Sequence, residues 1–195
     1  MRCLLVNACQ VACYICAWTT ASCMAAGQDS VSYFPTKVGA KWVYDLDGKD
    51  ITQEITAVKS RGDNVLVTVL RVDQFGTKRE AQIKITKKGL FQLTGGPADI
   101  HPPMWLLKLP HRDGAKWETF TGAAGTLAST VTAHGPEKIE VPAGKFEAIR
   151  TETIYPNKVG PNIVGKEWYA PGIGLVKEVF GEHVKVLKSI TPGKD

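Results

Sequence analysis

The residues best suited to chemistry at first sight are the aspartates of the segment Asp45-Leu-Asp47-Gly48-Lys-Asp50. An EF-hand calcium loop has an oxygen ligand at its fifth position and glycine at its sixth, whereas this segment has Lys49 and Asp50 there. The pair Asp47-Gly48 is instead typical of a two-residue turn between antiparallel strands. We therefore interpret the segment as a hairpin turn and not as a calcium site.

The four histidines are dispersed along the chain and do not pair with one another or with cysteine at a metal-ligand spacing: His101, His111, His134 and His183. No serine stands in a GxSxG motif, and no GxxxxGK loop is present to hold a phosphate group. The sequence thus predicts no catalytic residues, no metal site and no cofactor. We expect a protein that is not an enzyme.

All five cysteines fall within the first 23 residues: Cys3, Cys9, Cys13, Cys16 and Cys23. Residues 1–27 carry a single charge at Arg2, then a mostly apolar stretch over residues 4–18, then the small residues Ala25-Ala26-Gly27. This order is typical of a secretory signal peptide. We predict that residues 1–27 form the signal peptide of an exported protein, periplasmic or extracellular, whose remaining chain folds without disulfides.

Two processing routes fit this leader. Cleavage after Ala25 or Gly27 satisfies the small-residue requirement of ordinary signal peptidase. Alternatively, Thr20-Ala-Ser-Cys23 resembles a relaxed bacterial lipobox, in which Cys23 would become a lipidated N-terminus and anchor the protein to a membrane. Thr20 stands where lipoproteins usually have leucine, so we favour soluble secretion and keep the lipoprotein as the alternative.

After the leader, apolar and polar residues alternate in many short segments separated by glycine- and proline-containing turns. Trp42, Tyr44 and Leu46 alternate with polar neighbours, as do Ala81, Ile83 and Ile85. A period of two predicts strands, and their density predicts one all-β domain over residues 28–195. Residues 65–70 are apolar on both faces, which is typical of a strand deep in a sheet. We expect a curved antiparallel sheet or half-barrel with an apolar concave side and little helix.

The chain also repeats itself over a distance of 75 residues. The segment Pro35-Thr-Lys-Val-Gly-Ala-Lys-Trp42 returns as Pro110-His-Arg-Asp-Gly-Ala-Lys-Trp117. Further echoes follow in the same order downstream, such as Gly89-Leu90-Phe91 and Gly174-Leu175-Val176. This order predicts two similar halves, over about residues 33–95 and 108–190.

The stretch between these halves, residues 95–112, lacks clear alternation and contains four prolines. Proline limits any helix here to residues 104–109. We interpret the stretch as a connector whose apolar cluster either caps the core or covers a ligand cavity. The candidate ligand-binding residues are Met104, Trp105, Leu106 and Leu109.

The formal net charge is +5, and its excess is scattered rather than clustered. Several lysines alternate with apolar residues, as expected for a solvated sheet face: Lys84, Lys87, Lys88, Lys158, Lys166, Lys177, Lys185 and Lys188. No basic block interleaves with aromatic residues, so the sequence argues against a nucleic-acid partner.

Two motifs carry a family resemblance: VPAGxF…R over residues 141–150 and EWYAPGxGLVK over residues 167–177. Together with Phe34-Pro35 and Gly39-Ala-Lys-Trp42, they resemble a family of uncharacterised bacterial envelope proteins of unknown function. The similarity spans residues 31–190. It implies a curved antiparallel sheet and export, and it supplies no established catalytic or binding residues.

Two functions lead after this reading, well ahead of a third, a hydrolase whose residues assemble in space. The leading hypothesis is a non-enzymatic envelope protein that holds an apolar molecule or lipid on the concave face of its sheet. The alternative is an interaction or assembly module with a fully packed core that binds another envelope protein. The sequence leaves the oligomeric state open.

Overall fold

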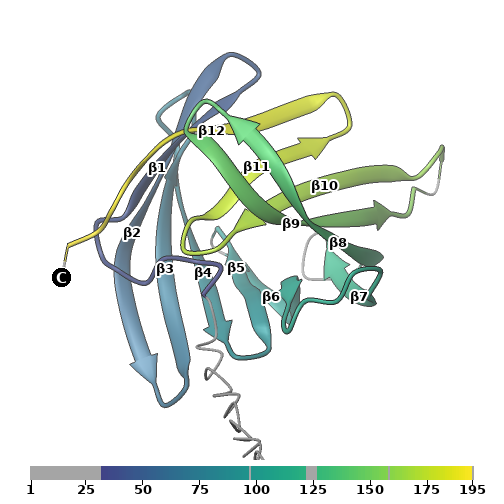
Figure 1. The fold of residues 1–195 in the computed structure, drawn as a ribbon, viewed down its shortest axis with the longest axis horizontal. Helices are drawn as coiled ribbons and strands as arrows, with labels where there is room; N and C mark the ends of the chain where they lie inside the picture. Colours follow the sequence, from purple (N-terminus) through teal and green to yellow (C-terminus); the bar gives the residue numbers. More distant parts are fainter. Residues whose placement is uncertain (1–31, 97, 122–126, 158, 195) are drawn as a thin grey trace, which may run out of the picture.

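The protein was analysed as a computed structural model that describes residues 32–96, 98–121, 127–157 and 159–194. The leader, with Cys23 and the processing sites, lies outside these residues. The described chain forms twelve strands, labelled in Figure 1: β1 (Lys41–Leu46), β2 (Lys49–Arg61), β3 (Asn64–Val72), β4 (Lys78–Thr86), β5 (Gly89–Gly95), β6 (Ala98–Lys108), β7 (Lys116–Thr121), β8 (Leu127–Val141), β9 (Gly144–Tyr155), β10 (Ile163–Ala170), β11 (Gly174–Phe180) and β12 (His183–Thr191).

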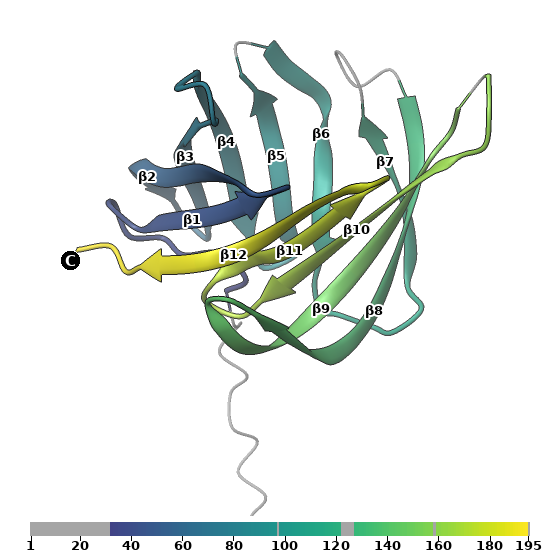
Figure 2. The same ribbon diagram turned by 90° about the horizontal axis from the view of Figure 1, so that it is seen from above.

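The twelve strands make one antiparallel sheet in the order β6-β5-β4-β3-β2-β1-β12-β11-β10-β9-β8-β7. Strands that follow one another in sequence are paired, except β6 and β7, which form the two edges. The last strand, β12, pairs with the first, β1, from Lys41 opposite Thr191 to Leu46 opposite Lys185. The sheet curls strongly, so that its two edge strands approach each other (Figures 1 and 2). The expected all-β fold with a curved antiparallel sheet is confirmed.

The edge strands β6 and β7 meet without a backbone ladder. The backbone N–H of Trp105 on β6 donates a hydrogen bond of 3.0 Å to Oγ1 of Thr119 on β7. The Lys108 ammonium lies 4.9 Å from the ring centre of Trp105 and 5.7 Å from that of Trp117. We call this junction the β6–β7 seam, because side chains rather than a strand ladder hold it.

The segment expected to be a connector is largely strand. Residues 98–108 form β6, which pairs with β5 from Gly89 opposite Lys108 to Gly95 opposite Ala98. Two register shifts in this pair, between Leu90 and Phe91 and between Gln92 and Thr94, disturb the alternation that would reveal a strand. Prolines are tolerated on an edge strand because their missing N–H is not needed by a neighbour. The interpretation as a connector was therefore wrong over these residues.

The turn expected at Asp47-Gly48 is confirmed. It joins β1 and β2, and both residues have positive φ angles, 51° and 82°. This is the backbone conformation of the tight turns that suit the twist of a two-stranded ribbon, and it explains why Asp and Gly stand there.

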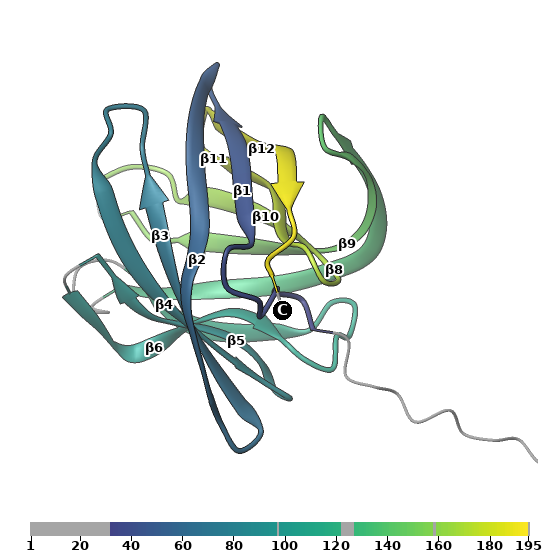
Figure 3. The same ribbon diagram turned by 90° about the vertical axis from the view of Figure 1, so that its left-hand side faces the viewer.

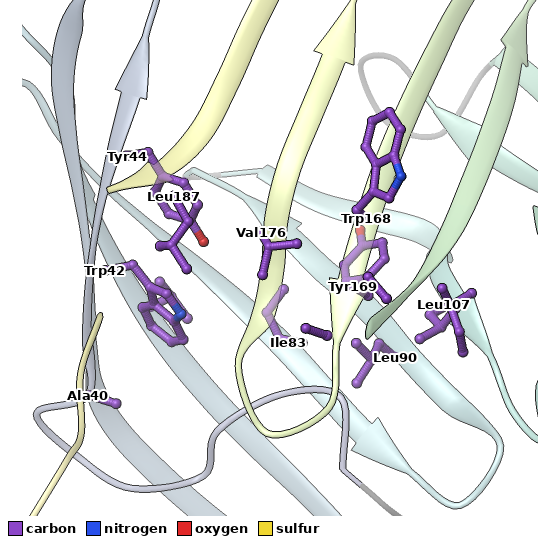
Figure 4. Packing of buried hydrophobic residues seen from close by; sticks show 14 of the residues in the cluster. Ala40, Trp42, Tyr44, Ile83, Leu90, Leu107, Trp168, Tyr169, Val176 and Leu187 are labelled. Atoms are coloured by element: carbon purple, nitrogen blue, oxygen red, sulfur yellow. The ribbon is translucent and has the colours of Figure 1, made fainter. Parts of the chain in front are cut away.

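The described core consists of one main cluster and a smaller one around Trp117, Val131 and Ala133. In β1–β6 its members are apolar, among them Ile55, Val67, Leu90 and Leu107, each with at most 1% of its surface exposed. Figure 4 shows Trp42, Tyr44 and Leu187 packed towards Ile83 and Leu90 from the facing part of the sheet. The expectation of an apolar concave side is correct for this half of the sheet.

The two Pro-x-x-x-Gly-Ala-Lys-Trp segments have the same local backbone structure. Gly39 donates its N–H to the carbonyl of Ile55 at 2.8 Å, and Gly114 donates its N–H to that of Ala133 at 2.8 Å. Both glycines have positive φ, 81° and 74°, which explains the glycine in each copy. Each segment leads into the first strand of a six-strand series, β1–β6 or β7–β12. The duplication itself stays a prediction.

The described residues contain no helix. Accordingly, none of them belongs to a helix with the length and apolar character needed to cross a membrane.

Candidate binding site on the concave side

A row of polar residues crosses four strands on the concave side. Thr151 on β9 stands opposite Glu167 on β10, Glu167 opposite Glu178 on β11, and Glu178 opposite Lys185 on β12. Residues directly opposite each other in antiparallel strands share a face of the sheet, so these four side chains lie side by side. We call them the polar row.

Glu167 is the centre of this row. The hydroxyl of Tyr169 donates a hydrogen bond of 2.8 Å to Oε2 of Glu167, and the hydroxyl of Thr151 donates one of 3.4 Å to the same oxygen. Burial among protein atoms, followed by the nearby negative charge of Glu178, raises the pKa of Glu167 to about 7. Its side chain nevertheless keeps part of its surface accessible. Glu167 therefore can change its charge near neutral pH.

Lys185 forms an ion pair with Glu178, and its side chain is only 8% exposed. The lysine ammonium also lies 5.4 Å from the ring centre of Tyr44, on the neighbouring strand β1. A buried lysine needs such partners, because an unpaired charge away from water is costly. The expectation that Lys185 belongs to a solvated face was wrong: its neighbours in sequence, Val184 and Val186, lie on the opposite, outer face.

An aromatic pair lies beside the polar row. The rings of Tyr155 and Phe180 meet edge to face, with centres 5.2 Å apart. Gly165 lies beneath them, and a Cβ atom there would come within 2.9 Å of the Tyr155 ring. Burial and the charge of Glu167 raise the pKa of Tyr155 to about 12, so this phenol stays neutral. The glycine thus makes room for the two rings.

A pocket of about 460 Å³ reaches the polar row at Glu178. Its lining comes from the β1–β2 hairpin, the β3–β4 turn and the β11–β12 hairpin: Leu46, Asp47, Lys49, Gln74, Glu178, Phe180 and His183. These elements gather at one end of the curled sheet (Figure 3). The pocket therefore lies at one end of the curled sheet and combines the apolar side chains of Leu46 and Phe180 with charged ones such as Glu178.

The rim of the pocket is fixed by Asp47. Its carboxylate accepts the backbone N–H of Val184 at 3.0 Å and lies 2.6 Å from Nδ1 of His183. These hydrogen bonds, the backbone bond first, lower the pKa of Asp47. The β1–β2 turn is thereby tied to the start of β12.

The four residues predicted to bind a ligand do not converge in one pocket. Leu109 lines a second pocket of about 200 Å³, together with Val65, Ile85 and Leu90. Trp105 packs against Trp117 at the β6–β7 seam, and Leu106 packs against the main core. Met104 stands opposite Gln92 on β5. A role for any of the four in ligand binding stays a prediction.

The charged pair Arg150 and Glu152 lies on the other face of β9 from Thr151. Arg150 Nη1 donates a hydrogen bond of 3.0 Å to Glu152, and its Nε lies 3.4 Å from Glu137, which also accepts a hydrogen bond from the Trp168 indole. The polar row, by contrast, was not predicted. Alternation places Glu167 on the same face as Tyr169, but a pattern of period two does not say which face is concave.

The polar row and its pocket offer ion pairing and hydrogen bonding beside apolar walls. Among the described residues, no three histidine, cysteine, aspartate or glutamate side chains gather closely enough to hold a metal ion. The arrangement is suited to holding a small molecule that has both an apolar and a polar part.

Two solved structures share this fold. One is a protein of Bacteroides fragilis assigned as exported and described with a YmcC-like fold; it is 16% identical, with a TM-score of 0.54, covering 83% of this chain and 99% of that one. The other is a protein of Parabacteroides distasonis assigned as a lipoprotein; it is 15% identical, with a TM-score of 0.53, covering 84% of this chain and 100% of that one. No family model and no curated protein matches the chain. At these identities the likeness shows the fold alone.

Proposed function

We propose that the protein is an exported, non-enzymatic envelope protein that holds a small molecule with an apolar part in the pocket beside the polar row. Export is supported by the leader-like residues 1–27 and by the assignments of the two proteins of similar fold. The observation that carries ligand binding is the pocket itself. Its volume of about 460 Å³ falls within the usual range of small-molecule sites, roughly 300–1,000 Å³.

The location of this pocket differs from the apolar sheet face expected from the sequence. Side chains such as Val67, Leu90 and Leu107 are buried on the concave side of β1–β6, and the pocket beside Leu90 is smaller, about 200 Å³. The open end between the β1–β2 and β11–β12 hairpins has apolar walls and remains accessible. A ligand with a short alkyl portion suits this space better than a long acyl chain.

Native mass spectrometry of the protein purified from its own host tests this function. We expect a bound small molecule that disappears in a Phe180→Arg variant, since Phe180 is 38% exposed and its replacement fills the pocket mouth with charge. Val159→Arg is the matched control, because Val159 is 97% exposed and lies outside the pocket. Repeated absence of any bound mass, together with no binding of short alkyl compounds, would contradict the proposal.

The β6–β7 seam favours a second candidate, an assembly module. Strand edges without a ladder are the places where a partner chain can add a strand. Pro102 and Pro103 remove two N–H donors from β6, so the pairing edge is restricted to the part near Trp105, where a partner strand would replace the Thr119 hydroxyl as acceptor. A partner present in stoichiometric amount, retained by the native protein and lost after Trp105→Pro, would favour this function over the first. Pro102→Ala is the control, because it restores a donor at the same edge.

A further inference from the structure

Acidic groups outnumber their basic partners around the pocket and the polar row, and Glu167 is the acidic group without an ion pair among the described residues. Two ion pairs lie at the pocket and the polar row: Asp47 with His183, and Glu178 with Lys185. No ion pair to Glu167 occurs within the described part of the chain, where its hydrogen-bond donors are the neutral hydroxyls of Thr151 and Tyr169. The polar row therefore holds two carboxyl groups and one ammonium group.

A cationic group is the complement that this row lacks. Resting on the function proposed above, we infer that the ligand carries a protonated amine, which binds between Glu167 and Glu178 while its alkyl part lies against Leu46 and Phe180. A primary ammonium has three N–H donors and no acceptor, which matches two neighbouring carboxylates. Glu178 belongs to both the pocket lining and the polar row, and Glu167, which does not itself line the pocket, stands directly opposite Glu178 on β10.

An anionic ligand fits the same pocket less well. Lys185 of the polar row is already paired with Glu178, and the lysine of the pocket lining, Lys49, has its ammonium 5.8 Å from the ring centre of the exposed Phe75. A carboxylate bound to Lys49 would be exposed to water and screened by salt, and exposed pairs of this kind contribute little. A carboxylate placed deeper would meet Glu167 and Glu178 and be repelled.

Binding of an amine should release a proton below neutral pH. Free Glu167 is mostly protonated at pH 6, and a cation beside it favours the ionised carboxylate, so the carboxyl proton leaves to solvent as the ammonium binds. The titratable groups that face Glu167 are Tyr155 on β9, Tyr169 on β10, Glu178 on β11 and Lys185 on β12. Burial raises the pKa values of both tyrosines, so neither loses a proton near pH 6.

Isothermal titration with three probes of equal chain length tests this inference on the purified protein: n-hexylamine, 1-hexanol and hexanoate. We expect hexylamine to bind roughly tenfold or more tightly than hexanol, and hexanoate to bind more weakly still. Titrations at pH 6 in two buffers of different ionisation enthalpy should show release of about one proton, which disappears at pH 8.5. Glu167→Gln should reduce hexylamine binding to the level of hexanol and abolish proton release.

The controls separate this inference from the function on which it rests. Glu140→Gln removes an exposed glutamate that pairs with Lys145 at 3.5 Å, and it should bind hexylamine as the native protein does. Equal binding of hexylamine and hexanol, or preference for hexanoate, overturns the amine and leaves the binding function standing. Binding of none of the three probes overturns both. Should Glu167→Gln fail to fold, the order of the three probes and the proton release of the native protein still decide the question.

Discussion

The interiors of the two halves of the sheet differ in chemistry, although each half contributes six antiparallel strands. In β1–β6 the buried side chains are apolar, as at Ile55 and Val67. Every described polar side chain that is buried belongs instead to β7–β12: Thr119, Ser129, Thr151, Thr153 and Lys185. Apolar burial alone can stabilise the first half. The stability of the second half also requires that its buried polar groups form hydrogen bonds or ion pairs. The difference concentrates the buried hydrogen-bonding side chains in the second half.

The same contrast is visible at two corresponding tryptophans. Trp42 and Trp117 follow the Gly-Ala-Lys segment of each repeat, and both are buried. The indole N–H of Trp42 donates a hydrogen bond of 2.8 Å to the carbonyl of Ile173, whereas that of Trp117 has no hydrogen-bond partner among the described residues. Equivalent positions in sequence thus have different contacts: Trp42 ties β1 to the β10–β11 turn by a hydrogen bond, whereas Trp117 contributes its ring to the β6–β7 seam beside Lys108.

The largest effect should come from Trp42→Ala. This change removes a side chain with 1% exposure and leaves the Ile173 carbonyl without its donor, so we expect the free energy of unfolding to fall by about 3–5 kcal/mol. Urea denaturation followed by circular dichroism measures it. Val38→Ala is the control, because Val38 is 47% exposed and should change stability by less than about 0.5 kcal/mol.

Replacing each tryptophan with phenylalanine sharpens the comparison. Trp42→Phe keeps most of the apolar volume and deletes the hydrogen bond, which should lower stability by about 1–3 kcal/mol. Trp117→Phe deletes an N–H that has no partner, so its cost should be smaller by the value of that hydrogen bond. Equal losses in the two variants would show that the tryptophans are not distinguished by hydrogen bonding.

The second effect is the pH dependence that Glu167 gives to stability. Its pKa is about 7 in the folded protein and 4.5 in its ordinary state, so between these values the folded state binds more protons than the unfolded chain. Stability from this group therefore falls as pH rises from about 4.5 to 7. Glu167→Gln should stabilise the protein at pH 8 by an amount on the order of 2 kcal/mol and change little at pH 4.

Urea denaturation of the Glu167→Gln variant and of the native protein from pH 4 to pH 8.5 measures this pH dependence of stability. The difference between the two curves isolates Glu167 from other groups that titrate in the same interval. The Glu140→Gln curve should run parallel to the native curve, since Glu140 is an exposed residue of β8 that pairs with Lys145. A Glu167→Gln curve parallel to the native one would mean that the carboxyl is solvated as in the unfolded chain.

The fold was largely predictable because period-two alternation survives wherever strands pair regularly. Trp42, Tyr44 and Ile83 alternate with polar residues, and they lie in β1 and β4 as expected. Strand β6 was missed because two register shifts displace its apolar residues from strict alternation and because prolines usually argue against a strand. Local pattern therefore fails at the edge of the sheet, where pairing on one side imposes fewer constraints.

The polar row could not be predicted, because it depends on long-range pairing. Glu167, Glu178 and Lys185 come from three strands, and only the register of β10, β11 and β12 places them opposite one another. In sequence, Lys185 and Lys177 both follow a valine within a strand-like segment. The ammonium of Lys177 nevertheless lies on the other face, 5.2 Å from the ring centre of Trp168. The assignment of inner and outer faces requires the closed sheet, since alternation alone is symmetric between them.

The smallest effect should arise at Thr119, where the two halves meet for the second time. At the β12–β1 junction a backbone ladder joins them, whereas at the β6–β7 seam the Thr119 hydroxyl accepts the N–H of Trp105. Thr119→Ala should cost about 0.5–1.5 kcal/mol and speed hydrogen exchange of the Trp105 amide, while Thr119→Ser should preserve its protection. Exchange of the Tyr44 amide, in the ladder, should not change in either variant. If Tyr44 and Trp105 lose protection together, the two junctions open as one cooperative unit, and the seam is no weaker than the ladder.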